Sequence, residues 1–147
     1  MQVQVADISD IPLLGEFLCK MNNDKTSHVG YCGTDLREII MALQEDFARE
    51  DGELSFVILK NESGEIQAAV GFDIDGRSAE VWGPFNSSNS YEYQNRLWEK
   101  AITEYREVKK YYFFLNESNV RQRAFLEDLG VKNTGEHLIL VIHKSQI

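Results

Sequence analysis

The four residues Trp82-Gly83-Pro84-Phe85 are the first candidate for a binding site in this sequence. Proline has no backbone N–H and glycine weakens a strand interior, so the pair predicts a point where regular strand pairing ends. Backbone groups that lose a strand partner are open to a ligand, and the two aromatic side chains would line an apolar slot. The alternative is a strand end whose aromatic side chains belong to the core.

Two carboxylates flank a predicted hairpin just before that string. Asp75-Gly76 is a strong signal for a two-residue turn, which places Asp73 and Glu80 on neighbouring antiparallel strands. A carboxylate held on a strand can take a proton from an ammonium group and so act as a general base. The alternative for Glu80 is an outward-facing charge that only faces its hairpin partner.

Polar and basic residues surround the starts of two predicted helices. Residues 86–90 offer hydroxyl and amide groups directly before a helix expected at 90–108, and the N-terminus of a helix attracts anions. Asn119 is expected to cap a second helix. On that helix, Arg121 and Arg123 either meet an anionic ligand or form a solvated helix face.

The remaining residues with reactive side chains give weaker signals. His28 and Tyr31 lie in a polar loop, where a lone histidine is most simply solvated. The two cysteines, Cys19 and Cys32, are too few for a disulfide scaffold. No spacing of His, Cys and carboxylate residues matches a metal signature, so no metal ion is expected.

Length and charge narrow the class of protein. The chain has 147 residues, 43% of them hydrophobic, which predicts one domain over 1–147 with a real core. Residues 1–88 hold 16 of the 24 Asp and Glu residues but only 6 of the 15 Lys and Arg residues. With no basic face for nucleic acid and no membrane-spanning run, a cytoplasmic protein is expected. The acidity of residues 1–88 either attracts cations or only confers solubility.

Hydrophobic periodicity predicts a strand, two helices and three strands, followed by helix, strand, helix and strand. The expected ranges, in that order, are 2–5, 11–21, 34–47, 54–59, 66–74, 78–82, 90–108, 111–115, 119–129 and 136–143. Gly71 is a candidate bulge in one of these strands. This order predicts the α/β (α+β) class, with a mixed, mostly antiparallel sheet and helices on both faces.

The order of elements, over essentially the whole chain, resembles the GNAT superfamily of acyl-CoA-dependent N-acyltransferases. The stretch from Asn119 to Val131 is similar to the family helix Asn-x-x-Ala-x-x-x-Tyr-x-x-x-Gly-Phe, with Gly130 at the family spacing. Gln122 stands in place of the small alanine. The resemblance implies a GNAT-like sheet, with acetyl-CoA as the acyl donor.

The sequence departs from the family at two chemically important places. The family's phosphate loop is Gln/Arg-x-x-Gly-x-Gly/Ala, whereas the matching segment 89–94 has no glycine and contains Glu92. The family tyrosine that protonates the departing thiolate is replaced by Leu126. Either Tyr91 or Tyr93 would then donate the proton, or the thiolate leaves unassisted, or there is no catalysis.

The resemblance implies an N-acetyltransferase whose acceptor is a small cationic amine or a basic peptide. The general base would be Glu80, with Asp73 as the second choice, and His28 and Tyr31 would border the acceptor. The acyl donor would be held by two sets of residues: Trp82, Gly83, Pro84 and Phe85 for pantetheine, and Asn89, Ser90, Tyr91, Asn119 and Arg123 for the phosphates.

Two alternatives stay open. The missing loop glycines and Leu126 favour a non-catalytic GNAT-like module that senses a ligand or binds a partner. The chain also resembles one half of a tandem GNAT arrangement, which would make it a homodimer in which a second copy replaces the missing half.

Overall fold

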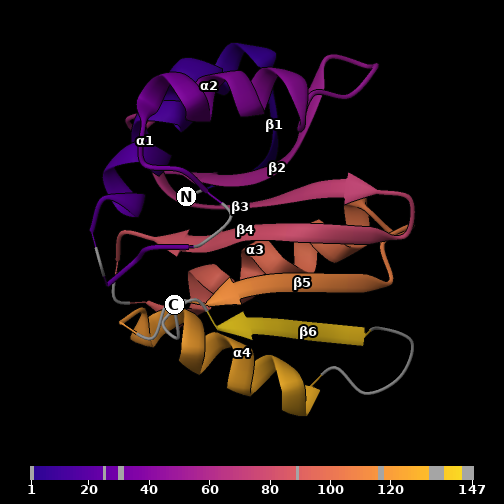
Figure 1. Cartoon of the computed structure of the whole chain (residues 1–147). Helices are drawn as coiled ribbons and strands as arrows, with labels where there is room; N and C mark the ends of the chain where they lie inside the picture. Colours follow the sequence, from indigo (N-terminus) through magenta and orange to yellow (C-terminus); the bar gives the residue numbers. More distant parts are fainter. Residues whose placement is uncertain are drawn as a thin grey trace.

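One mixed sheet runs through the molecule, and its strands lie side by side in chain order (Figure 1). The computed structural model describes residues 2–24, 26–29, 32–88, 90–115, 118–132 and 138–143. Within these residues the strands are β1 Gln2–Asp7, β2 Glu53–Lys60, β3 Ile66–Asp75, β4 Ser78–Asn86, β5 Lys110–Leu115 and β6 Leu138–His143. The first four are antiparallel neighbours, and β5 runs parallel to both β4 and β6. The predicted mixed, mostly antiparallel sheet is confirmed.

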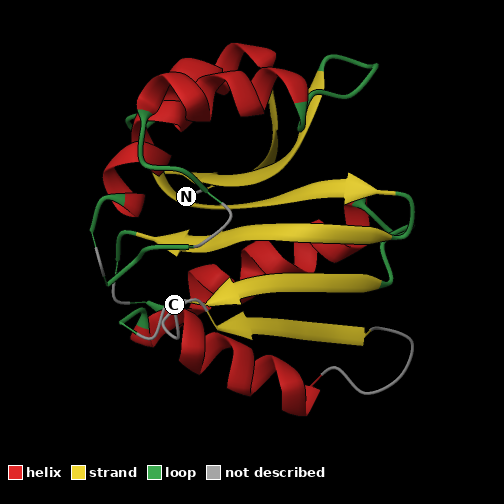
Figure 2. Cartoon of the chain, in the orientation of Figure 1, coloured by secondary structure: helices red, strands yellow, loops and turns green. Residues whose placement is uncertain are grey.

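The helices lie on both faces of the sheet, as predicted (Figure 2). A short 3-10 helix, Ile8–Asp10, leads into α1 Ile11–Asn22, which packs with α2 Leu36–Glu45 on one face. On the other face lie α3 Tyr91–Glu104 and α4 Val120–Lys132. Among the described residues, none of the helices combines the length and the apolar character that a membrane crossing requires.

Each face of the sheet has its own hydrophobic core, because successive strand residues point to opposite faces. On the α3–α4 side, the ring of Trp98 lies 5.4 Å from that of Phe72 and 5.7 Å from that of Phe125, between centroids. On the α1–α2 side, Phe47 and Phe56 are in contact at 5.0 Å. Each such buried side chain contributes about 1.5–3 kcal/mol, so the sheet is fixed from both sides.

The irregularity expected at Gly71 is present in the pairing of β3 with β4, where the register shifts between Ala69 and Gly71, but the extra residue is not on β3. Gly71 is paired with both Phe56 and Trp82, and an added Cβ would lie 2.1 Å from the Phe56 ring, so the glycine makes room for that ring. The extra residue lies on the facing segment of β4, at Gly83 and Pro84. Gly83 has φ +107°, a conformation that favours glycine.

Three helices differ from their predicted ranges by two residues or more. The helix expected at 90–108 ends at Glu104, because Tyr105 leaves the helical dihedral angles. The helix expected at 34–47 starts after Asp35, whose side chain accepts a hydrogen bond from the Arg37 N–H, and it ends at Glu45. The last helix does not end before Gly130 but continues to Lys132. Glycine is only a weak stop signal, because it adopts helical dihedral angles as readily as left-handed ones.

Candidate functional site

The strands β4 and β5 separate half-way along β4. They pair in parallel from Ser78 with Lys110 to Val81 with Phe113, and the described residues form no further pair between them. β4 nevertheless continues to Asn86, paired with β3 on its other side. After Val81, the β4 backbone therefore has no strand neighbour on the β5 side, as the Gly-Pro pair predicted.

The aromatic side chains of this segment lie in the core. Trp82 is 5% exposed and packs against Phe47, with ring centroids 4.7 Å apart, and Phe85 is 1% exposed. Both belong to the core under α1 and α2. Gly83 and Pro84, between the two rings, are buried as well.

A side chain of α4 occupies one of the backbone groups that the separation leaves without a strand partner. The Nε2 of Gln122 donates to the carbonyl oxygen of Gly83 over 2.7 Å, and the side chain is fully buried. The Oε1 of the same carboxamide has no hydrogen-bond partner. An unpaired buried acceptor costs about 1–3 kcal/mol.

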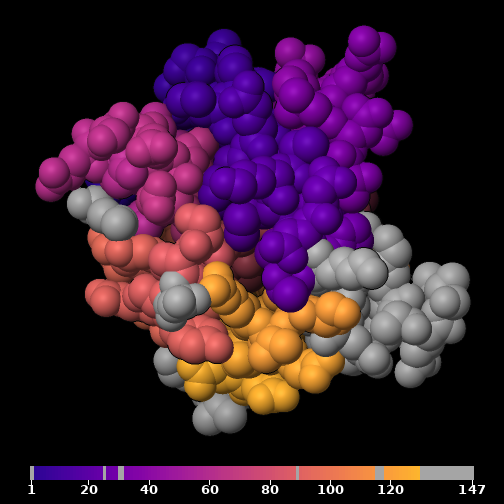
Figure 3. All heavy atoms as spheres, turned by 90° about the vertical axis from the view of Figure 1, so that its left-hand side faces the viewer, coloured from indigo at the N-terminus to yellow at the C-terminus, as the bar shows by residue number. Residues whose placement is uncertain are grey.

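Residues at the start of α4 form hydrogen bonds to two other segments, the α1–α2 loop and the chain from the end of β4 to α3. Asn119 caps the helix, as predicted, because its Oδ1 accepts a backbone N–H of that turn at 3.0 Å, and its Nδ2 donates to the carbonyl of His28 over 3.2 Å. Arg121 donates to the carbonyls of Asn86 and Ser88 over 2.7 and 2.6 Å. Figure 3 looks onto this face, where atoms of the α1–α2 loop (violet), the start of α3 (coral) and α4 (orange) lie side by side.

The loop before α3 is closed by its own side chains. Asn86 Nδ2 donates to the Ser90 carbonyl over 2.7 Å, and the Ser90 N–H donates to Ser88 Oγ over 3.1 Å. Ser90 is the N-cap residue of α3, but its side chain makes no capping hydrogen bond. Tyr91 is 52% exposed at the start of the helix, and Asn89 lies outside the described residues.

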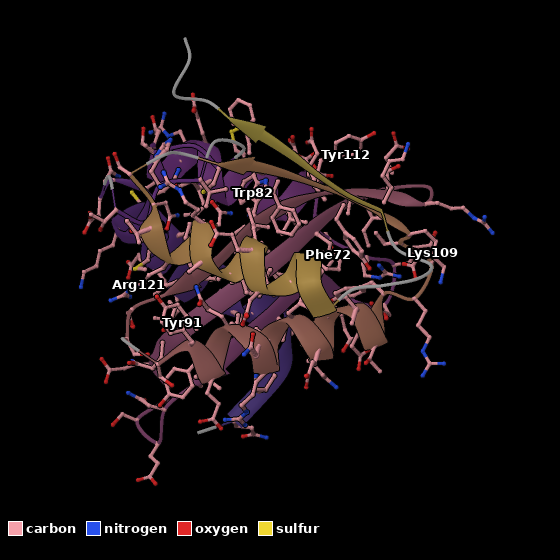
Figure 4. All side chains as sticks on the ribbon, turned by 90° about the horizontal axis from the view of Figure 1, so that it is seen from below. Phe72, Trp82, Tyr91, Lys109, Tyr112 and Arg121 are labelled. Atoms are coloured by element: carbon pink, nitrogen blue, oxygen red, sulfur yellow. The ribbon has the colours of Figure 1, made fainter. Side chains whose placement is uncertain are left out.

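A hollow of about 290 Å³ lies between α3 and α4. It is lined by Tyr91, Gln94, Asn95, Ala124, Phe125 and Asp128. Gln94 is 1% exposed, and its Oε1 has no hydrogen-bond partner. Figure 4 shows the two helices side by side, with Tyr91 and Arg121 at the same end of the pair.

The two predicted carboxylates meet next to the strand separation. Asp73 is the register partner of Glu80, which is also paired with Tyr112 of β5, one residue before the last β4–β5 pair. Asp73 is half-buried and Glu80 is exposed. Burial, and then the negative charges of Asp46, Glu80 and Asp75, raise the pKa of Asp73 from 3.8 to about 6. Asp73 therefore titrates close to neutral pH.

The remaining residues that the sequence predicted for the site either lie on other elements or fall outside the described residues. The Nδ1 of His28 is 2.9 Å from the carbonyl oxygen of Asn22. Arg123 is exposed on α4, and Leu126 belongs to the core between the sheet and α3 and α4. Tyr31 lies outside the described residues. Among the residues with a described placement, no three His, Cys, Asp or Glu side chains are grouped so as to hold a metal ion.

Sequence reasoning missed two residues, one that holds the α1–α2 loop and one that acts on Asp73. Asn22 is 1% exposed, accepts the Val29 N–H at 2.6 Å and donates to the Gly33 carbonyl at 2.8 Å, which fixes the α1–α2 loop. The sequence signal for Asn22 is its position four residues after Leu18, which places a polar side chain on the apolar stripe of the helix. Asp46, which raises the pKa of Asp73, has no local signal, because only the docking of α2 brings it there.

Solved structures share this fold at low sequence identity. A GNAT-family acetyltransferase from Staphylococcus aureus matches with a TM-score of 0.64 and 15% identity, over 88% of this chain and 82% of that one. A mutant protein from Bacillus halodurans matches with a TM-score of 0.53 and 14% identity, over 94% of this chain and 97% of that one. No family model matches the sequence, and the search of curated proteins finds no match.

At 14–15% sequence identity, structural similarity establishes the fold of this chain. The likeness to the acetyltransferase covers most of both chains. The chain therefore has a GNAT-like fold, as the sequence resemblance predicted.

Proposed function

We propose that this protein is an acetyl-CoA-dependent N-acetyltransferase that acts on a small cationic amine or a basic peptide. The observation that carries the proposal is the separation of β4 and β5 after Val81, with Glu80 and its register partner Asp73 directly beside it. An acyl donor and an amine would meet at this point. The acetyltransferase with the same fold supports the reaction class.

The acyl donor would lie on the α3–α4 side of the separation. Its pantetheine half would extend along β4 after Val81, where, among the described residues, that strand no longer pairs with β5. Its phosphates would lie toward Ser90 and Asn119. They fit less well, because Glu92 adds a negative charge to the first turn of α3.

The chemistry needs one proton acceptor beside the amine. A carboxylate takes a proton from the ammonium group, and the freed lone pair attacks the thioester carbonyl carbon. The C–N bond forms, the C–S bond breaks, and a second proton from the nitrogen ends on the departing thiolate, so the products are an amide and a thiol. We assign the first step to Asp73, which the sequence ranked second to Glu80, because a pKa of about 6 leaves Asp73 ionised at neutral pH yet still basic. Glu80 would hold the cationic acceptor beside it.

The charge on this side favours a cationic acceptor. Asp46, Asp75 and Glu80 all act electrostatically on Asp73, so four carboxylates share one region. Such a field raises the local concentration of cations and speeds their encounter. A polyamine, an aminoglycoside or a lysine-rich peptide has the matching chemistry.

Thiol release from acetyl-CoA, measured against a panel of these three acceptor classes, tests the proposal. We expect release with at least one of them, and a loss of kcat of about 100-fold or more in the Asp73→Asn variant. Glu62→Gln removes a carboxylate from the exposed turn between β2 and β3 and serves as the control, with nearly unchanged kcat. No release with any acceptor contradicts the enzymatic proposal.

A second candidate is a non-catalytic module of the same fold that binds a ligand. The hydrogen bond from Gln122 to Gly83 favours it, because a side chain already occupies a β4 carbonyl. Leu126, buried in the core, cannot supply a proton to a thiolate. Saturable binding of acetyl-CoA without turnover of any amine in the panel would select this module.

A further inference from the structure

We propose that Asn119 is a positioning residue for the acceptor: by holding the carbonyl of His28, it keeps the α1–α2 loop against the start of α4. The inference rests on the proposed function and concerns the acceptor's side of that site. It predicts that the loss of this one hydrogen bond weakens acceptor binding and leaves the binding of acetyl-CoA unchanged.

The side chain of Asn119 makes two contacts inside the protein, and it is only 3% exposed. Its Oδ1 accepts the backbone N–H of Gln122 at 3.0 Å, which caps α4, and its Nδ2 donates to the carbonyl of His28 over 3.2 Å. The first contact is local, whereas the second joins residues that are 91 apart in the sequence. Because the oxygen serves the helix and the nitrogen serves the loop, a substitution can remove one contact and keep the other.

The loop segment that Asn119 holds is fixed from its other side by the end of α1. The Nδ1 of His28 lies 2.9 Å from the carbonyl oxygen of Asn22, and the Val29 N–H donates to Asn22 Oδ1 over 2.6 Å. A carbonyl oxygen only accepts hydrogen bonds, so Nδ1 carries the proton of this pair. His28 is therefore held between α1 and the start of α4.

Arg121 provides a second link between α4 and the same loop. Hydrogen bonds from Thr26 and, to a smaller extent, the positive charge of Arg121 lower the pKa of Asp24. The same guanidinium donates to the carbonyls of Asn86 and Ser88, after the strand separation. The start of α4 thus contacts both the loop and the end of β4, and these segments lie side by side in Figure 3.

The loop is held one turn of α4 away from the strand separation. Gln122 follows Asn119 by three residues and donates to the carbonyl of Gly83, just after the last β4–β5 pair. The bond to Gly83 and the bond to His28 therefore start from the same turn of the helix. The position of the loop relative to the separation depends on Asn119.

The loop also belongs to the face of the sheet on which the amine is proposed to react. Phe72 and Val81 point into the core under α3 and α4, so the residues next to them, Asp73 and Glu80, point to the opposite face. Val29 of the loop is buried in the core on that opposite face, with α1 and α2. An amine beside Asp73 is therefore on the loop's side of the sheet, and the acyl donor is on the other side.

Steady-state kinetics with the best acceptor of the panel, together with calorimetric titration of acetyl-CoA, tests this role. Asn119→Ser keeps an oxygen that can cap α4, but its side chain is too short to reach His28. We expect the KM of the acceptor to rise about 3- to 10-fold, as the loss of one neutral hydrogen bond predicts, with kcat and the Kd of acetyl-CoA changed less than about twofold. Val120→Ala, at the exposed neighbouring position, is the control and should change none of the three values.

Amide hydrogen exchange distinguishes a released loop from a general loss of stability. Asn119→Asp keeps the size of the side chain and the cap, but a carboxylate cannot donate to the His28 carbonyl. In both Asn119 variants we expect exchange in residues 26–29 to become about 3- to 10-fold faster, with the rates in β3 unchanged. A variant that is only less stable would exchange faster in β3 as well, and it would lose kcat without a rise in KM.

The outcomes separate the two proposals. An unchanged acceptor KM in Asn119→Ser, or unchanged loop exchange in both variants, would overturn this inference and leave the proposed function in place. A Kd of acetyl-CoA that rises more than the acceptor KM would do the same, because Asn119 would then act on the donor. A wild-type chain that transfers no acetyl group to any amine of the panel overturns the inference and the proposed function together.

Discussion

The carboxamide of Gln122 donates to the carbonyl oxygen of Gly83 over 2.7 Å, beside the point at which β4 and β5 separate. A side-chain amide thus takes the place that a strand neighbour would have. With the two bonds from Arg121 to the end of β4, it fixes α4 to the last third of that strand. These contacts from α4 therefore hold β4 in place where it is separated from β5.

The backbone of Gly83 should not tolerate a side chain. Gly83 has φ +107°, and an added Cβ would lie 2.7 Å from the Phe85 backbone nitrogen. We expect Gly83→Ala to lower the free energy of unfolding by about 1–3 kcal/mol. Gly33→Ala is the control, since its Cβ meets only one atom, at 3.8 Å. Equal stability of the two variants in urea would contradict the strained bulge.

The cost of adding a side chain at Gly71 should depend on the size of the side chain at position 56, because the Phe56 ring occupies that space. The Cβ of an alanine would lie 2.1 Å from that ring, which Phe47 and Trp82 hold in place. We expect Gly71→Ala to cost about 1–3 kcal/mol in the wild-type background and less than half of that in Phe56→Leu. A double-mutant cycle by urea unfolding measures this coupling, and additive costs would show that the contact is not the cause.

The stability of the protein should depend on pH through Asp73. Its pKa rises from 3.8 to about 6 on folding, so the folded state binds the proton more tightly than the unfolded chain does. This group's contribution to stability is therefore fully present below about pH 4 and is lost as the pH rises through about 6. Asp73→Asn should raise Tm at pH 8 but not at pH 4. The control Glu62→Gln, in an exposed turn, should leave Tm unchanged at both pH values. A Tm gain that is the same at both pH values would argue against the raised pKa.

The α1–α2 loop should depend on Asn22. Its carboxamide accepts the Val29 N–H and donates to the Gly33 carbonyl inside the protein. We expect Asn22→Ala to cost about 2–4 kcal/mol, because two buried backbone groups lose their partners. Asn23→Ala, at the exposed neighbour, should cost less than half as much. Urea midpoints of the two variants give the comparison.

Local signals in the sequence predicted the elements and the end of strand pairing. The predicted hairpin forms with Gly76 and Arg77 as its two loop residues, directly after Asp75. Gly83-Pro84 lies just after the last β4–β5 pair, because turns and proline act within a few residues. The contact of Gln122 with Gly83 joins residues 39 apart, and it depends on how α4 is rotated over the sheet. No periodicity encodes that rotation. The pKa of Asp73 likewise depends on Asp46, which only the packing of α2 brings near.

The central claim is that the separation of β4 and β5 binds the thioester of an acyl donor beside the Asp73–Glu80 pair. The most direct measurement is a crystal structure of the wild-type protein with acetyl-CoA. The prediction is density for the pantetheine arm between the ends of β4 and β5, with the thioester at the point where the two strands separate. Acetyl-CoA bound elsewhere, or crystals that take up no acetyl-CoA at about 1 mM, would contradict the account.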